Sequence, residues 1–210
     1  TTKIMATTEH SDLEQQIIKT AQQLFIEKGF VETSMSDIAA KVGINRPGLH
    51  YYFRTKERMF QAVFGEIVLF LLPKIQDIVL QKDKPVTERV GGVIDAYFEV
   101  FSENPRLPLF VMRESNRDVN HLINTLADLR LERNFLEIAR SLQDEMDSGR
   151  LKPVPLRFVF FTFYSLLIMP FVMKDLCASL FLEKGESFEE MFARWKPYIV
   201  MQMDNLLRVD

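Results

Sequence analysis

The chain has 210 residues, of which 47% are hydrophobic and 26% are charged, and its formal net charge is −3 at pH 7. These proportions are typical of a folded globular protein and exclude a disordered or low-complexity polymer. Only 8 glycines and 9 prolines stand beside 18 phenylalanines and 10 methionines, which argues against a many-stranded barrel or sandwich. The single cysteine, Cys177, excludes an internal disulfide framework and is typical of a small buried hydrophobic residue.

No pattern in the sequence indicates catalysis, a cofactor or a metal. The three histidines, at positions 10, 50 and 121, are far apart and lack metal-ligand spacing. The chain contains no Gly-x-Ser-x-Gly, no phosphate-binding glycine loop and no His-Glu-x-x-His. Three clustered acidic residues lack calcium-loop spacing and favour a solvated helix face: Asp144, Glu145 and Asp147. We therefore expect no enzyme, no cofactor and no bound metal.

The N-terminal segment predicts one amphipathic helix. Ser11 with Glu14 forms a capping-box pair at its expected start, and Gly29 stands where a C-terminal cap belongs. The inward face consists of apolar residues at helical spacing: Leu13, Ile17, Ala21, Leu24 and Phe25. The first ten residues lack the apolar core of a signal peptide, so we expect a cytoplasmic protein.

The next segment has the pattern of a helix, a glycine turn and a second helix. Ser34 and Asp37 form a capping box, and Gly43 provides the turn. Asn45 can cap the following helix, whose first turn tolerates Pro47 because a missing N–H costs little there. Small and apolar residues hold the two helices at a fixed angle: Ile38, Ala39, Val42 and Leu49. A helix-turn-helix has these parts, and its second helix offers its N-terminal side chains to the DNA major groove.

Positive charge gathers on this part of an acidic chain. Between residues 41 and 58, one acidic residue, Glu57, stands against five basic ones: Lys41, Arg46, Arg54, Lys56 and Arg58. Salt screens charges more than about 10 Å away, so a basic face on an acidic body can bind phosphate. A basic face that is merely solvated is the alternative that charge alone leaves open.

The remaining sequence also has helical periodicity. The predicted helices, of which the first begins after a Thr55 cap, cover residues 56–81, 86–102, 106–116, 119–147, 156–182 and 188–208. Pro170 and Pro197 should kink the last two. The charge-free stretch 158–173 has 16 residues, fewer than the roughly 20 that span a bilayer, so we expect a buried or interface helix and no membrane partner.

A series of residues between Ile17 and Met59 matches a known family pattern in order and spacing. The matching residues are Ala21, Leu24, Phe25, Glu27, Lys28, Gly29, Phe30, Thr33, Ser34, Met35, Ser36, Asp37, Ile38, Ala39, Val42, Gly43, Tyr51, Tyr52, Phe53, Lys56 and Glu57. They resemble the DNA-binding domain of the TetR (tetracycline-repressor-like) family of bacterial transcription regulators. The resemblance implies an all-α fold, with a helix-turn-helix DNA-binding domain at residues 1–55 and a larger helical ligand-binding and dimerisation domain at 56–210.

The resemblance also implies particular DNA contacts. Arg46 should reach a base edge, and Tyr51, Lys56 and Ser34 should each bind phosphate. The full predicted set is Thr33, Ser34, Asn45, Arg46, Pro47, Gly48, His50, Tyr51 and Lys56. Two positions depart from the family pattern: Gly48 stands where Ser or Thr often contacts DNA, and His50 stands where an aromatic residue or Leu is frequent. The alternatives are a solvated Arg46, packing roles for Tyr51 and His50, and a core position for Tyr52.

In the C-terminal domain the resemblance implies a pocket for a small lipophilic inducer. The candidate lining residues are Phe64, Phe98, Phe101, Phe110, Met112, Phe161, Tyr164 and Met169. The alternative is that these side chains only form core. Arg113, Glu114 and Asn116 either recognise a polar end of the ligand or pair on the surface.

A homodimer through the last two helices is a further implication, and Trp195, Tyr198 and Met201 suit its interface. A symmetric dimer fits a palindromic double-stranded DNA operator. The sequence thus predicts a ligand-responsive, sequence-specific regulator, most commonly a repressor that an inducer releases from its operator. The alternative is a helical hydrophobe-binding protein whose helix-turn-helix no longer binds DNA. The basic cluster favours the regulator, and Gly48 slightly favours the alternative.

Overall fold

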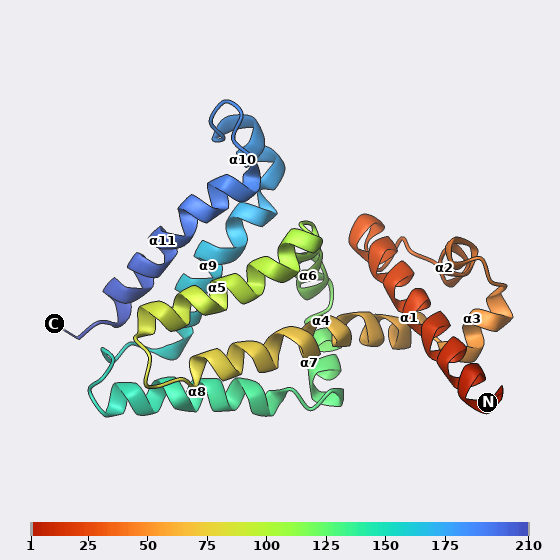
Figure 1. Ribbon diagram of the computed structural model, residues 1–210, viewed down its shortest axis with the longest axis horizontal. Coiled ribbons are helices and arrows are strands. Elements are labelled where there is room, and N and C mark those ends of the chain that lie inside the picture. Colours follow the sequence, from red (N-terminus) through yellow and green to blue (C-terminus); the bar gives the residue numbers. More distant parts are fainter. Residues whose placement is uncertain (1, 210) are drawn as a thin grey trace. The chain divides into compact units, whose positions relative to one another are not determined.

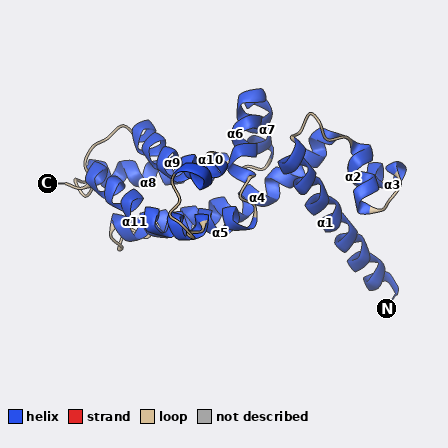
Figure 2. Ribbon diagram, turned by 90° about the horizontal axis from the view of Figure 1, so that it is seen from above, coloured by secondary structure: helices blue, strands red, loops and turns tan. Residues whose placement is uncertain are grey.

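A computed structural model describes residues 2–209, with side chains described from Asp12 onward. In this part of the chain every regular element is a helix (Figure 2), which confirms the predicted all-α class. The helices are α1 (Thr2–Lys28), α2 (Met35–Val42), α3 (Arg46–Tyr52), α4 (Lys56–Val79), α5 (Val86–Glu103), α6 (Leu107–Arg117), α7 (Val119–Asp128), α8 (Glu132–Asp147), α9 (Leu156–Val172), α10 (Lys174–Leu180) and α11 (Phe188–Leu207).

The helices differ from the prediction in three places. α1 begins at Thr2, so the backbone of Ser11 lies within the helix rather than at its start. The helix predicted over 119–147 is two helices, because Arg130 adopts a left-handed backbone with φ of 56° and breaks the hydrogen-bond ladder. The helix predicted over 156–182 is also two, α9 and α10, which meet at a bend of 70°. Among the described residues no single helix is long and apolar enough to cross a membrane, and α9 with α10 meets that test only as a bent pair.

Pro170 affects the hydrogen bonding of α9. A proline has no N–H, so the carbonyl of Leu166, four residues earlier, lacks its usual helical donor. The indole Nε1 of Trp195 donates to that carbonyl at 3.0 Å. The hydrogen bond from Trp195 to this carbonyl therefore links α11 to α9.

The chain divides into two compact units. The first contains the residues up to Val68 together with Phe110–Leu129, and the second contains Leu69–Leu109 and the residues from Arg130 onward. This grouping differs from a division at residue 55, because α7 and most of α6 pack with the N-terminal helices. α4 begins in the first unit and ends in the second (Figure 1).

The first unit is built on an aromatic core. The rings of Phe25, Phe30 and Phe60 lie within 5.3–6.1 Å of one another. Ile38 and Leu49 are fully buried and hold α2 and α3 together, as the helix-turn-helix pattern predicted. Such burial contributes roughly 1.5–3 kcal/mol per large apolar side chain.

Caps fix the ends of the two helices of the motif. The predicted Ser34–Asp37 capping box is present at the start of α2. Gly43 ends that helix with φ of 87°, and its N–H donates to the carbonyls of Ala39 and Ala40. Glycine is favoured here because a Cβ is strained in this left-handed conformation.

The second unit packs α5, α9 and α11 against one another. An aromatic cluster lies among them, in which Phe98 stacks on Phe192 at 5.1 Å and Phe171 contacts Phe101 and Phe188. Leu167 and Ile199 are fully buried beside it. These three helices supply part of the lining of the cavity described below.

Candidate nucleic-acid interface and apolar cavity

α3 presents a basic and aromatic face to solvent. Arg46, Pro47, His50, Tyr51 and Arg54 line one open surface depression, and Tyr51 is 73% exposed. The sequence predicted four of these five as DNA contacts. Arg54 was counted in the basic cluster but was not assigned a role, and only the fold shows that it shares this face.

The cap at the start of α3 gives a local reason for a glycine at position 48. Asn45 caps α3 by accepting the Gly48 N–H at 2.7 Å. A Cβ at position 48 would lie 3.0 Å from the Asn45 Oδ1, so a larger residue would crowd the cap. Glycine at position 48, where Ser or Thr is frequent in the family, therefore leaves room for the Asn45 side chain to cap α3 closely.

Thr33 lies in the core and not on the exposed face of α3. Its side chain is fully buried, and its hydroxyl donates to the carbonyl of Gly29 at 2.8 Å and is 3.2 Å from that of Leu24. Where the sequence predicted a DNA contact, the structure gives this hydroxyl the role of closing the C-terminal end of α1. Burial, which the local pattern did not reveal, is the reason for the difference.

The hydroxyl of Ser34 is engaged in the capping box. It donates to the Asp37 carboxylate at 2.8 Å and accepts from the Asp37 N–H at 3.1 Å. The Asp37 carboxylate also accepts the Ser34 N–H at 3.0 Å, and the two hydrogen bonds that it accepts, from the Ser34 hydroxyl and the Ser34 N–H, lower the pKa of Asp37 below its usual value. Ser34 remains exposed at the start of α2, so its phosphate contact stays a prediction.

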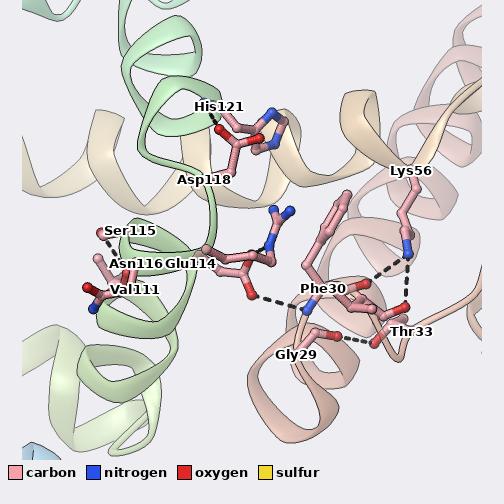
Figure 3. A network of polar contacts seen from close by, with 12 residues as sticks. Gly29, Phe30, Thr33, Lys56, Val111, Glu114, Ser115, Asn116, Asp118 and His121 are labelled. Carbon is pink, nitrogen blue, oxygen red and sulfur yellow. Dashed lines mark hydrogen bonds and ion pairs between the residues drawn. The ribbon is translucent and has the colours of Figure 1, made fainter.

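Lys56 is also engaged by the protein (Figure 3). Its ammonium donates to the carbonyls of Phe30 at 2.9 Å and Val31 at 3.2 Å, and it lies 4.5 Å from the centre of the Phe30 ring. The side chain is only half-buried. A phosphate bound by Lys56 would share an ammonium that already joins α4 to the loop after α1.

Glu114 holds the same loop from α6 (Figure 3). Its carboxylate accepts the Phe30 N–H at 3.3 Å and a hydrogen bond from Arg117 Nε at 2.6 Å. Glu114 is 4% exposed, and the Arg117 guanidinium lies 4.7 Å above the Phe30 ring. The sequence suggested a ligand contact or a surface pair for Glu114, but the structure places it in a clasp of Lys56, Glu114 and Arg117 around Phe30.

The second unit contains a partly open cavity of about 90 Å³. Apolar side chains dominate its lining, which consists of Leu72, Ile75, Val79, Val86, Arg89, Val90, Val93, Phe135, Ile138, Leu142, Val159, Phe160, Phe163, Tyr164, Met203 and Leu207. Apolar cavities are ordinary sites for small hydrophobic ligands.

The predicted pocket residues fall in several places. Of the eight, Tyr164 belongs to the lining of this cavity. The others are core or surface residues: Phe98 and Phe101 pack in the core of the second unit, Phe64 and Phe110 are buried in the first, and Met112, Phe161 and Met169 are exposed. Helical periodicity identified apolar positions but not which of them face one another.

Two polar pairs adjoin the cavity. Arg89 and Glu145 form a buried, bidentate ion pair, with 5% and 3% of their side chains exposed. Glu145 is thus not on the solvated helix face that the sequence suggested, because this register of α8 turns it inward. Tyr97 and Tyr164 join their hydroxyls at 2.7 Å. Burial raises the pKa of Tyr97 well above its usual value and also raises that of Tyr164, so both are protonated at neutral pH.

One face of α9 and α11 is apolar and uncovered. Phe161 is 67% exposed and Tyr198 is 56% exposed, and Phe158, Met169 and Met201 are exposed as well. Trp195 stacks on Tyr198 at 5.9 Å. Large exposed apolar patches of this kind mark interaction surfaces.

The helix-turn-helix with its exposed basic helix defines a DNA-binding regulator. Residues 17–63 match the family described as bacterial regulatory proteins, tetR family. Residues 17–63 therefore form a TetR-type DNA-binding domain, and the curated relatives that the chain matches are transcriptional regulators.

Curated relatives are regulators of this kind, and a solved structure shares the fold. The chain is similar to YfiR of Bacillus subtilis, an HTH-type transcriptional regulator, at 26% identity over 160 residues, or 70% of this chain and 73% of the relative. It is similar to the repressor BdcR of Escherichia coli at 33% identity over 90 residues, 43% of this chain and 45% of the relative. The ketosteroid regulator KstR2 of Mycobacterium tuberculosis has the same fold, with a TM-score of 0.66, 18% identity and coverage of 93% and 95%. The chain spans from 37% to 73% of the length of the curated relatives that it matches.

Proposed function

We propose that this protein is a ligand-responsive repressor that a small lipophilic inducer releases from a palindromic operator. The operator lies in the bacterial cytoplasm, which is where the protein would act. The names of BdcR and KstR2 describe repressors and support this direction of control. The rest of the proposal depends on three features of the chain itself.

The first feature is the face of α3. Arg46 and Arg54 are exposed on it together, and arginine pairs bidentately with guanine in the major groove. Tyr51 and His50 are exposed on the same surface, which supports a contact of each with the DNA backbone. We assign base contact to Arg46 and phosphate contact to Arg54, Tyr51 and His50.

The second feature is the exposed apolar face of α9 and α11. We propose that two copies of the chain bury this face against each other, with Phe161 and Tyr198 near its centre. Aromatic residues and methionine are enriched in the cores of such interfaces. A twofold dimer would present two α3 helices to half-sites about 34–36 Å apart, or a multiple of that distance.

The third feature, which carries the proposal, is the course of α4. This helix begins at Lys56, in the clasp around Phe30, and its later residues Leu72, Ile75 and Val79 line the cavity. One continuous helix thus joins the support of the DNA-binding motif to the proposed inducer site. A ligand that displaces the cavity end of α4 would disturb the clasp at the other end and weaken DNA binding.

Operator titration with and without inducer tests the proposal. A coupling of about 1–3 kcal/mol, typical of allosteric proteins, would weaken operator binding about 5- to 150-fold, and operator would weaken inducer binding by the same factor. A variant with the cavity filled, Val159→Phe, should still bind the operator and should lose the response. Equal ligand affinity of the free and the operator-bound protein would overturn the proposal.

The second candidate is a hydrophobe-binding protein without DNA recognition. The close cap at Gly48, which leaves no side chain at a position that often contacts DNA, is the observation in its favour. Tight ligand binding together with sequence-independent DNA affinity would support it.

A further inference from the structure

The ion pair beside the cavity leaves part of one guanidinium unused. The Nη1 of Arg89 donates to Glu145 at 2.8 Å and to the carbonyl of Val79 at 2.8 Å, and its Nη2 donates to Glu145 at 2.7 Å. Its Nε is buried and has no hydrogen-bond partner among the described residues. Ser141 lies one turn before Glu145 on α8. Its hydroxyl is another buried polar group that has no hydrogen-bond partner among the described residues.

A guanidinium has two faces that can each bind an acceptor with two parallel N–H groups. Glu145 occupies the face formed by Nη1 and Nη2. The face formed by Nε and Nη2 stays unfilled, on a side chain that is 5% exposed and belongs to the cavity lining. A buried donor without a partner costs about 1–3 kcal/mol, so an acceptor that reaches it is favoured.

We propose that Arg89 selects inducers that carry a neutral hydrogen-bond acceptor, such as a ketone or ester carbonyl, on a short apolar chain. This inference rests on the proposed function of the cavity as an inducer site. It names the chemical class of ligand, which neither the fold nor the relatives define for this chain.

Charge balance favours a neutral acceptor over a carboxylate. Arg89 and Glu145 already neutralise each other in a buried environment. A ligand carboxylate at the unfilled face would add one negative charge close to Glu145 and leave the group with a net buried charge, which proteins rarely tolerate. A carbonyl oxygen accepts the same hydrogen bonds without that penalty.

The size of the cavity favours a short chain. An apolar cavity of about 150 Å³ is large enough to bind benzene, and this cavity has about 90 Å³. A chain of a few carbons fits inside the cavity, and a six-carbon chain also displaces Val93 and Leu142 or extends from the open side of the cavity, whereas a bulkier ligand requires the helices to part.

Three probes of similar length test the inference: 2-hexanone, hexane and hexanoate, each titrated at pH 7 into the full chain labelled with ¹⁵N at arginine and with ¹³C at the methyl groups of valine and leucine. We expect the Arg89 Nε–H signal to move with 2-hexanone and to stay in place with hexane. Methyl signals of Val93 and Leu142 should move with both. Hexanoate should bind at least about tenfold more weakly than 2-hexanone.

A double variant, Arg89→Met with Glu145→Leu, removes both charges together and keeps the volume, a kind of change that proteins often accept without loss of stability. It should weaken 2-hexanone binding about tenfold, the effect of one ordinary hydrogen bond, and change hexane binding less than about twofold. Tighter binding of hexanoate, an unmoved Nε–H signal with 2-hexanone, or equal losses for ketone and alkane would each overturn the inference.

The failure of the inference is distinguishable from that of the proposed function. If 2-hexanone engages Arg89 but operator affinity is unchanged, the inducer proposal fails and the selectivity of the cavity stands. If ligands release the operator with an affinity that is indifferent to Arg89, the inducer proposal stands and the role of Arg89 fails.

Discussion

Replacing Glu114 with alanine should destabilise the first unit by about 2 kcal/mol. The change leaves the buried Phe30 N–H without its acceptor, which costs about 1–3 kcal/mol. It also removes the partner of Arg117, whose side chain is 32% exposed, so that loss adds less than about 1 kcal/mol. The first effect dominates, because water cannot replace an acceptor at a buried amide.

Urea unfolding by far-ultraviolet circular dichroism, with amide exchange at Phe30, measures the effect. Two variants serve as controls: Arg117→Ala loses only the partly exposed pair, and Glu114→Gln keeps an acceptor for the Phe30 N–H. Each should cost less than about 1 kcal/mol. The single tryptophan, Trp195, lies in the second unit, so its fluorescence should respond less than the exchange at Phe30. A surface substitution usually changes the free energy of unfolding by no more than about 0.5 kcal/mol. A change as small as that in the Glu114→Ala variant would refute the role of this clasp.

Four more outcomes follow from the structure. Arg46→Ala should relax sequence specificity by about 1–3 kcal/mol in competition binding with mutated operators, and equal discrimination would exclude base contact. Thr33→Val should lower the free energy of unfolding by about 1 kcal/mol and leave operator specificity unchanged, measured by urea unfolding and gel shift. The hydrogen bond from Ser34 lowers the pKa of Asp37, so the stability from this cap is present above pH 3.8, the usual pKa, and is lost as the pH falls through the lowered value; Ser34→Ala should flatten the acid side of a stability–pH curve. If the proposed dimer forms, Phe161→Glu should convert it to monomers in sedimentation, and an unchanged mass would remove α9 from the proposed interface.

Local signals in the sequence predicted the helix-turn-helix well. The capping box at Ser34, the glycine turn at Gly43 and the Asn45 cap act over three or four residues, and the structure contains all three. The same local reasoning predicted the all-α class, because it depends on helical period and on the scarcity of turn residues. These features need no knowledge of distant contacts.

Features set by distant contacts were not predictable in this way. Glu114 meets Phe30 across 84 residues of sequence, and Arg89 meets Glu145 across 56. Periodicity shows that such a residue is on an inward face but not which residue it meets. For the same reason, of the eight residues proposed to line a pocket, Tyr164 is the one that belongs to the cavity lining.

Selection of operator-length duplexes from a random pool by the purified protein, at about 0.15 M salt, tests the central claim most directly, since specificity is meaningful only at a stated salt concentration. The account predicts an enriched palindrome whose half-sites are one helical turn or a multiple apart. It also predicts that Arg46→Ala changes the bases enriched within each half-site. A folded, dimeric protein that enriches no sequence in the absence of bound ligand would contradict the claim that this chain is a sequence-specific regulator.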